Sequence, residues 1–211
     1  MRGLLPYAAL TALGCVLTTT AEKAKQNPVP PNTLRASPST TFNDPENGVS
    51  FRYPSSWKLS KEASFYMRPS ISADRTPQAI VTFDPEGTLY ETTVFDGLEF
   101  VYVVVPHSSP EACAKLITAN TTLDAKPDRT VIVNKIPFLR LSDVEVGMCH
   151  HKDGKIYQVF RNGRCYLFET DFYTFCENTA DDRRALSDPE ATTLERQLDS
   201  VLQSIKITEA K

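Results

Sequence analysis

The sequence of 211 residues is poor in features that mark several common classes of protein. It contains three histidines, one tryptophan and eight glycines, with neither the Gly-x-Ser-x-Gly elbow of a hydrolase nor a glycine-rich phosphate loop. Its lysines and arginines are dispersed, without the basic cluster of a nucleic-acid-binding protein. Beyond residue 21, no apolar stretch approaches the length of a transmembrane helix, about 20 residues. The sequence therefore indicates no nucleic-acid partner, no cofactor and no membrane-spanning helix.

Residues 1–21 have the layout of a secretory signal peptide. Arg2 supplies a positive start, residues 4–17 are mostly apolar, and residues 18–21 are small. This order of a charged, an apolar and a small-residue region is typical of a segment that directs export. Cleavage after Ala21 would leave Glu22 as the new N-terminus. We expect the remaining chain to fold outside the cytoplasm, in a secreted or periplasmic, oxidising location.

A second processing route stays open. Residues 12–15 (ALGC) resemble a bacterial lipobox, in which Cys15 would carry a lipid. The lipobox usually has leucine three residues before the cysteine, where this chain has Ala12. A lipid on Cys15 would be the only membrane attachment that the sequence offers.

Two further regions follow the predicted signal peptide. Residues 22–46 are rich in Pro, Ser and Thr, and this composition buries too little apolar surface to offset the entropy of ordering. We predict a disordered tether there and one folded domain over residues 47–208. Such a domain is long enough to bury a core of its own.

The folded region alternates short strand patterns with two helix patterns. Residues 109–111 open a helix in which Ser109 is the cap and Pro110 the first residue, with Ala112, Cys113, Leu116 and Ala119 as its buried positions. A second helix runs from about Asp188, its cap, to Ser204, with an apolar stripe of Leu194, Leu198, Val201 and Leu202. Strands are expected at residues 49–53, 79–83, 100–105, 130–133 and 138–141. This pattern predicts an α+β domain with a central antiparallel sheet.

A three-stranded meander is the clearest local pattern. Residues 144–151, 155–161 and 164–171 read as strands joined by tight turns. The turns are predicted at Asp153–Gly154 and at Asn162–Gly163, because both dipeptides tolerate the positive φ of a two-residue hairpin loop.

Three segments together carry a resemblance to a known family. They are residues 48–57 (GVSFRYPSSW), 162–169 (NGRCYLFE) and 198–206 (LDSVLQSIK). An aromatic strand, a proline, a small pair and a tryptophan near the start, with a terminal helix and Leu-x-Ser-Ile-Lys, look like PsbP-like and DcrB-like exported proteins. The resemblance implies a three-layer α/β/α fold, an antiparallel sheet sandwiched between helices. The family includes photosystem accessory subunits and bacterial envelope proteins, and it shares no catalytic motif to place on this chain.

The four cysteines of the folded region are Cys113, Cys149, Cys165 and Cys176. Four cysteines in an exported domain predict two disulfides. The expected meander puts Cys149 and Cys165 two strands apart, about 10 Å, which exceeds the roughly 7 Å that a disulfide spans. Both remaining connectivities join Cys113 to a cysteine of the meander. We favour Cys113 with Cys165 and Cys149 with Cys176, and the other connectivity stays open.

Metal binding and hydrolysis are the two alternative functions. Cys149 and His151 would share one face of a strand and offer two metal ligands, but zinc usually takes at least three from the protein. A hydrolase could use His107 or a surface carboxylate pair. The candidate pairs are Asp84 with Glu86, Asp143 with Glu145, and Asp181 with Asp182.

Neither alternative has a complete set of residues, so we interpret the chain as a non-enzymatic binding or accessory protein of the cell envelope or extracellular space. Its partner would be a protein or a small molecule. We expect the protein to be a monomer.

Overall fold

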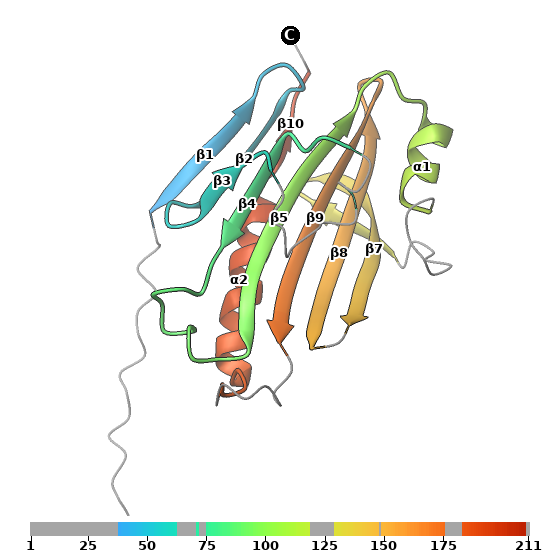
Figure 1. Ribbon diagram of the computed structural model, residues 1–211. Helices are drawn as coiled ribbons and strands as arrows, with labels where there is room; N and C mark the ends of the chain where they lie inside the picture. The colour runs from blue at the N-terminus through green and yellow to red at the C-terminus, as the bar shows by residue number, and fades with distance from the viewer. Residues whose placement is uncertain are drawn as a thin grey trace, which may run out of the picture. The chain divides into compact units, whose positions relative to one another are not determined.

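Two antiparallel sheets form the framework of the protein (Figure 1). The computed structural model describes residues 38–62, 71, 75–118, 129–147, 149–175 and 183–209. Within these ranges the chain is α+β, with mostly antiparallel strands and two helices, as predicted. Neither of these helices combines the length and the apolar character needed to cross a bilayer.

The larger sheet has seven strands, and two of its inner neighbours are far apart in the sequence. β5 (Phe95–Val105) pairs with β9 (Arg164–Phe175). The sheet order is β3 (Lys58–Ser60), β4 (Ala79–Phe83), β5, β9, β8 (His150–Arg161), β7 (Ile136–Gly147) and β6 (Arg129–Val133). β5 is buried from Leu98 to Val103, which confirms the central position expected for it.

The smaller sheet has three strands and corrects the end of the predicted tether. β2 (Val49–Pro54) pairs with β1 (Ser39–Asp44) on one side and with β10 (Lys206–Ile207) on the other. β1 lies inside the range 22–46, which the sequence analysis assigned to a disordered tether. It folds because its backbone pairs with β2 and because Phe42 stacks on Phe51, with ring centroids 4.8 Å apart. Residues 22–37 lie outside the described part of the chain.

The meander has longer strands than predicted, and one predicted turn is wrong. Asn162 and Gly163 do form the β8–β9 turn, with φ values of 51° and 71°. Asp153 and Gly154 instead lie inside β8, which begins at His150. β7 ends at Gly147 and β8 begins at His150, and Cys149, just before β8, has a φ of 63°. Gly154 pairs with Asp143 of β7 and with Asp171 of β9, and both residues come close to it.

The two helices pack on opposite faces of the seven-stranded sheet. α2 (Asp188–Gln203) buries the predicted stripe of Leu194, Leu198, Val201 and Leu202 against a cluster that includes Phe100 and Phe168. α1 (Pro110–Thr118) buries Cys113 against a second cluster that includes Val101 and Leu167. Side chains alternate between the faces of a strand, so the odd-numbered residues of β9, and those of β5 beyond its bulge at Phe95 and Gly97, point to the α1 side. We name these two sides the α2 face and the α1 face.

The side chains of α1 are less buried than predicted. The Ser109 hydroxyl accepts a hydrogen bond from the Ala112 N–H at 3.1 Å, as expected of the cap. The Ala112 side chain is exposed, and Leu116 is only half-buried. The short helix contacts the sheet mainly through Cys113, so the other predicted positions gain little cover. Ala119 lies outside the described residues.

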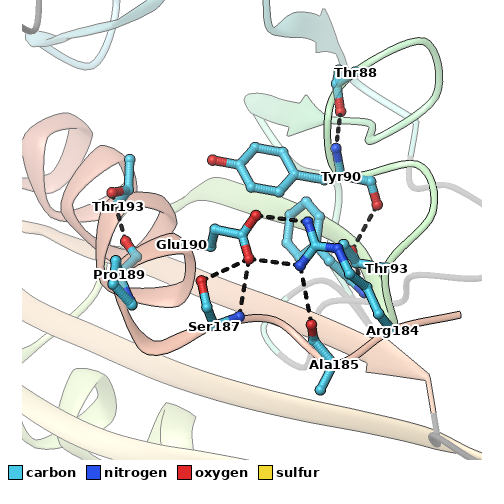
Figure 2. A network of polar contacts seen from close by, with 10 residues as sticks. Thr88, Tyr90, Thr93, Arg184, Ala185, Ser187, Pro189, Glu190 and Thr193 are labelled. Carbon is cyan, nitrogen blue, oxygen red and sulfur yellow. Dashed lines mark hydrogen bonds and ion pairs between the residues drawn. The ribbon is translucent and has the colours of Figure 1, made fainter. Parts of the chain in front are cut away.

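A polar network fixes the start of α2 (Figure 2). The Arg184 guanidinium donates two hydrogen bonds to the Glu190 carboxylate, at 2.8 and 2.7 Å. The backbone N–H and hydroxyl of Ser187 donate to the same carboxylate, so Ser187, rather than the predicted Asp188, is the N-cap. The Arg184 pair and these bonds lower the pKa of Glu190 to about 2. Arg184 also accepts a backbone bond from Val94, which ties the β4–β5 connection to the helix.

Candidate functional site

Five ionisable side chains converge inside the seven-stranded sheet. They come from four adjacent strands that lie side by side in Figure 1. We name them the charged cluster: Glu99 of β5, Asp143 of β7, Lys152 of β8, and Glu169 and Asp171 of β9. Glu169 and Asp171 continue the row of Cys165 and Leu167, so the cluster lies on the α1 face. Glu99, Glu169 and Asp171 have exposed fractions of 0%.

Lys152 contributes a positive charge, its ammonium group, to the charged cluster. Its Nζ atom lies 2.5 Å from Asp143 Oδ2, 3.2 Å from Glu169 Oε1 and 3.9 Å from Asp171 Oδ1. Burial by itself would lower the pKa of Lys152, but the carboxylates around it raise that pKa above its usual range. Lys152 therefore stays protonated although only 4% of its side chain is exposed.

Two carboxylates of the cluster are incompletely satisfied. Both Glu99 oxygens and Asp171 Oδ1 are buried and accept no hydrogen bond from the described residues. Burial, followed by the negative charge of Glu169, raises the pKa of Glu99 to about 8. The same two causes raise the pKa of Asp171 well above its usual value. Glu99 thus has no hydrogen-bond donor among the described residues, and the nearest cation to Asp171 Oδ1 is the Lys152 ammonium, 3.9 Å away.

Neighbouring groups hold the other carboxylate oxygens in place. The Tyr173 hydroxyl donates to Asp171 Oδ2 at 3.1 Å, and the Ile71 N–H donates to Glu169 Oε2 at 2.9 Å. Burial, followed by the charge of Asp171, raises the pKa of Tyr173, which keeps its hydroxyl a donor. The buried Ile71 covers this part of the α1 face. Donors from β9 itself, at Tyr173, and from outside the sheet, at Ile71, therefore fix these carboxylates in place.

Gly154 lies at the centre of the cluster and has no room for a side chain. In the sheet it pairs with Asp143 on one side and with Asp171 on the other. A Cβ atom at Gly154 would lie 2.5 Å from the Asp143 carbonyl oxygen and 2.6 Å from Asp171 Oδ1. The absence of a side chain here lets the two carboxylate residues approach each other across β8.

A recess opens beside the charged cluster at the β7–β8 hairpin. We name it the hairpin recess; its volume is about 280 Å³ and it is lined by Asp96, Glu145, Gly147, His150, His151, Lys152 and Tyr173. Lys152 and Tyr173 belong to both the recess and the surroundings of the cluster. They connect the buried carboxylates with the surface.

A second recess has the opposite electrostatic character. We name it the basic recess; its volume is about 380 Å³ and it is lined by Thr41, Ser50, Phe51, Arg52, Asn134, Gln203, Ser204 and Lys206. Arg52 and Lys206 are exposed, and the lining contains no carboxylate. Ser204 joins the recess to β2, because its hydroxyl accepts from the Arg52 N–H at 2.7 Å.

The structure contains the disulfide Cys113–Cys165, the pairing that the sequence analysis favoured. The two Cα atoms are 5.3 Å apart, and both residues are almost fully buried on the α1 face. The Gln158 side-chain amide donates to the Cys113 carbonyl oxygen, which gives α1 a second attachment to β8. Cys149 is disulfide-bonded as well. Its predicted partner Cys176 lies outside the described residues, as does Cys15.

Because Cys149 is disulfide-bonded, the prediction that Cys149 and His151 are metal ligands is wrong. A sulfur atom in a disulfide has no thiolate to offer a metal ion. Cys149 also lies in the β7–β8 turn rather than in a strand, because β8 begins one residue later. The two residues therefore do not form the ligand pair that the strand pattern predicted.

The candidate hydrolytic residues are spread over separate parts of the structure. His107 is exposed in the β5–α1 connection with a φ of 51°. Asp84 and Glu86 lie in the β4–β5 connection, where Asp84 pairs with Lys58 at 3.7 Å. Asp143 belongs to the charged cluster, whereas Glu145 lines the hairpin recess. Asp181 and Asp182 lie outside the described residues.

Sequence reasoning recognised only Asp143 of the charged cluster. Glu169 and Asp171 fall inside the predicted strand 164–171 and Glu99 falls just before the predicted strand 100–105, and the sequence pattern assigns no function to these three residues. A usable signal was present, because two acidic residues at alternate positions in a buried strand point to the same face. The sequence pattern does not show which strands lie next to the strand that carries Glu169 and Asp171.

Comparisons with known proteins find likeness only among solved structures, at low identity. No family model matches the chain, and no curated protein matches it by sequence. Among solved structures, cyanobacterial PsbP from Synechocystis sp. PCC 6803 is 14% identical, with a TM-score of 0.41 over 83% of this chain and 96% of that one.

Two further structures are similar at the same level. The Ran-binding protein Mog1p of Saccharomyces cerevisiae is 6% identical, with a TM-score of 0.46 over 82% of this chain and 97% of that one. A protein of Bacteroides thetaiotaomicron VPI-5482 is 11% identical, with a TM-score of 0.41 over 80% of this chain. The match spans 48% of that longer protein. With TM-scores below 0.5, these likenesses support no statement about family, activity or partners.

Proposed function

We propose that this chain is an exported, non-catalytic binding or accessory protein of the cell envelope or extracellular space, which recognises an anionic group at the basic recess. A three-layer PsbP-like α/β/α arrangement is part of the same proposal. The observation that carries it is the contrast between the two sets of charges. The carboxylates with raised pKa values are enclosed in the sheet, whereas the basic recess offers its cations to solvent.

The placement of the carboxylates argues against general acid–base catalysis. A catalytic acid or base must come within hydrogen-bond reach of the substrate. Glu99 and Asp171 have the raised pKa values that suit such a role, but both have exposed fractions of 0%. They are therefore out of reach of a substrate molecule, and the charged cluster serves the interior of the sheet.

The basic recess has the composition of a site for an anion. Arg52 of β2 and Lys206 of β10 lie on neighbouring strands, where Lys206 pairs with Ser50, two residues from Arg52. Guanidinium and ammonium groups are the usual partners of carboxylate and phosphate oxygens. Hydroxyl and amide groups of Thr41, Ser50 and Gln203 add neutral hydrogen-bonding capacity. The recess volume lies in the range of small-ligand sites, about 300–1,000 Å³.

A titration of the folded domain with inorganic phosphate tests this site. We expect saturable NMR shifts of the amide signals of Ser50, Arg52, Asn134 and Lys206. The double variant Arg52→Gln/Lys206→Gln should weaken binding by about tenfold or more, because a charge-assisted hydrogen bond contributes about 1.5–3 kcal/mol.

A matched control removes the same charge elsewhere. Lys61 and Arg196 are exposed and do not line the recess, so Lys61→Gln/Arg196→Gln should bind phosphate as the wild type does. Equal weakening in both double variants, or shifts that never saturate, would show general charge attraction and contradict a site at the basic recess.

Export is tested by the mature N-terminus. The cysteine pairing supports an oxidising location, since persistent disulfides form mainly outside the reducing cytoplasm. We expect mass spectrometry of protein from the native host to find a chain that begins at Glu22, outside the cytoplasm. A lipid-modified N-terminal Cys15 would show the anchored route, which is also export. Retention of unprocessed protein in the cytoplasm would contradict the proposal.

A further inference from the structure

We propose that the charged cluster binds a divalent cation, Ca²⁺, through carboxylate oxygens of Asp143, Glu169 and Asp171, with Glu99 as a fourth acidic ligand. This inference goes beyond the proposed function and does not depend on the basic recess. Each of the first three residues has a carboxylate oxygen, and these oxygens lie within 4.8 Å of one another. Oxygen ligands suit hard cations such as Ca²⁺ rather than zinc or copper.

The spacing of the oxygens suits Ca²⁺ better than Mg²⁺. Ca²⁺ binds oxygen at about 2.3–2.6 Å, so two oxygens on one ion can be up to roughly 5 Å apart. Mg²⁺ bonds of about 2.1 Å restrict that separation to about 4.2 Å and require nearly octahedral geometry. A set of carboxylates held by three different strands meets the looser requirement of Ca²⁺ more easily.

The independent sign of a ligand site is Glu99. It pairs directly with Asp171 across the β5–β9 ladder, so the two carboxylates are neighbours on the α1 face. Its exposed fraction is 0%, and neither of its oxygens accepts a hydrogen bond from the described residues. Asp171 Oδ1 also accepts no hydrogen bond from the described residues, and Lys152 Nζ lies 3.9 Å from it. Buried carboxylates without donors are costly, and a bound cation would supply the missing partner.

Gly154 provides space beside these oxygens. It lies between Asp143 and Asp171 in three adjacent strands, and a Cβ atom there would come within 2.6 Å of Asp171 Oδ1. A side chain at this position would fill the gap between the two acidic residues. The strand therefore uses glycine where an ion between Asp143 and Asp171 needs room.

Lys152 supplies both a competitor and an entry route. Its ammonium group lies where the three carboxylates converge, which is also where the cation would lie. The Lys152 side chain lines the hairpin recess together with Asp96 and Glu145. Rotation towards these two carboxylates would give the ammonium new partners and open the cluster to an incoming ion. Ca²⁺ and the Lys152 ammonium should therefore compete for the same oxygens.

The test uses the complete mature protein with its disulfides intact, freed of metal with EDTA and titrated with CaCl₂ by calorimetry. We expect one saturable Ca²⁺ site and a higher melting temperature in Ca²⁺ than in EDTA. Tb³⁺ should replace Ca²⁺ and show luminescence excited through Tyr173, which touches Asp171. Asp171→Asn should weaken Ca²⁺ binding by about tenfold or more.

Lys152→Met separates a cation site from a purely structural ion network. Removal of the competing ammonium should strengthen Ca²⁺ binding and make the folded state depend on Ca²⁺. In a structural network the same variant would be destabilised equally in Ca²⁺ and in EDTA, which would overturn the proposal.

Asp153→Asn is the matched control, because Asp153 lies on the opposite face of β8 and pairs with Lys155. It should bind Ca²⁺ like the wild type. The proposal is also overturned if millimolar Ca²⁺ gives no saturable binding, or if Asp171→Asn binds as tightly as Asp153→Asn does.

Discussion

Raising the pH from about 5 to 9 in the presence of EDTA is expected to lower the free energy of unfolding by several kcal/mol. Burial and the charge of Glu169 raise the pKa of Glu99 from 4.5 to about 8. The folded state binds this proton more tightly than the unfolded chain does. Its contribution is fully present below pH 4.5 and is lost as the pH rises through about 8. Asp171 acts in the same direction, because its pKa is raised too.

Glu99→Gln tests the origin of this pH dependence. The amide keeps the shape of the carboxyl group but has no proton to lose, so this variant should be more stable than the wild type at pH 9. Each pKa unit corresponds to about 1.4 kcal/mol, so most of the slope between pH 5 and 8 should disappear. Urea unfolding followed by circular dichroism at a series of pH values measures both effects.

The exposed Glu86 provides the control for this experiment. Glu86→Gln removes the same charge at the surface and should leave the pH dependence of the wild type intact. A stability curve of Glu99→Gln that runs parallel to that of the wild type would mean that Glu99 is already ionised in the folded state.

Replacing both cysteines of the buried disulfide, as Cys113→Ala/Cys165→Ala, should lower the free energy of unfolding by about 4 kcal/mol. The two residues are 52 positions apart in the sequence. A cross-link that closes a loop of this length removes much conformational entropy from the unfolded chain. Urea unfolding at neutral pH gives the difference directly, and α1 should show faster amide exchange than β9.

The position of α1 gives the reason for the local part of this effect. Cys113 is the one residue of α1 in the buried cluster of the α1 face, and the helix is only nine residues long. Isolated helices of that length are marginal in water. A loss below about 1 kcal/mol, with unchanged exchange in α1, would show that packing and the Gln158 hydrogen bond hold the helix without the disulfide.

Local patterns were sufficient for several elements of this fold. The apolar stripe of α2 repeats at helical spacing, and the structure buries the same four leucine and valine residues. The strand at residues 79–83 matches β4. Asn162–Gly163 forms its predicted turn, because only residues that tolerate positive φ fit there. In each of these cases the deciding interactions lie within a few residues of one another.

Other features depended on groups that are distant in the sequence. Gly154 follows Asp153, and this dipeptide predicts a turn, yet the structure uses the glycine where β7 and β9 approach it from both sides. Phe42 belongs to a stretch with the composition of a tether, but pairing with β2 makes it part of a sheet. Both predictions failed because the competing interaction was a strand pair, which local composition does not reveal.

The amino-acid sequence alone determined the α+β class and the α2 stripe, because periodicity and short turn motifs depend on interactions between residues close in the sequence. It favoured the bridge Cys113–Cys165 but left a second connectivity open, and the structure contains the favoured one. Only the tertiary structure decided that Glu99 lies opposite Asp171 and that Lys152 lies among the carboxylates. The alternation of side chains along a strand shows which residues share a face. Which strands are neighbours depends on how the whole sheet packs, and the local sequence does not show it. The charged cluster exists because β5, which precedes β9 by about seventy residues of sequence, is its partner in the ladder.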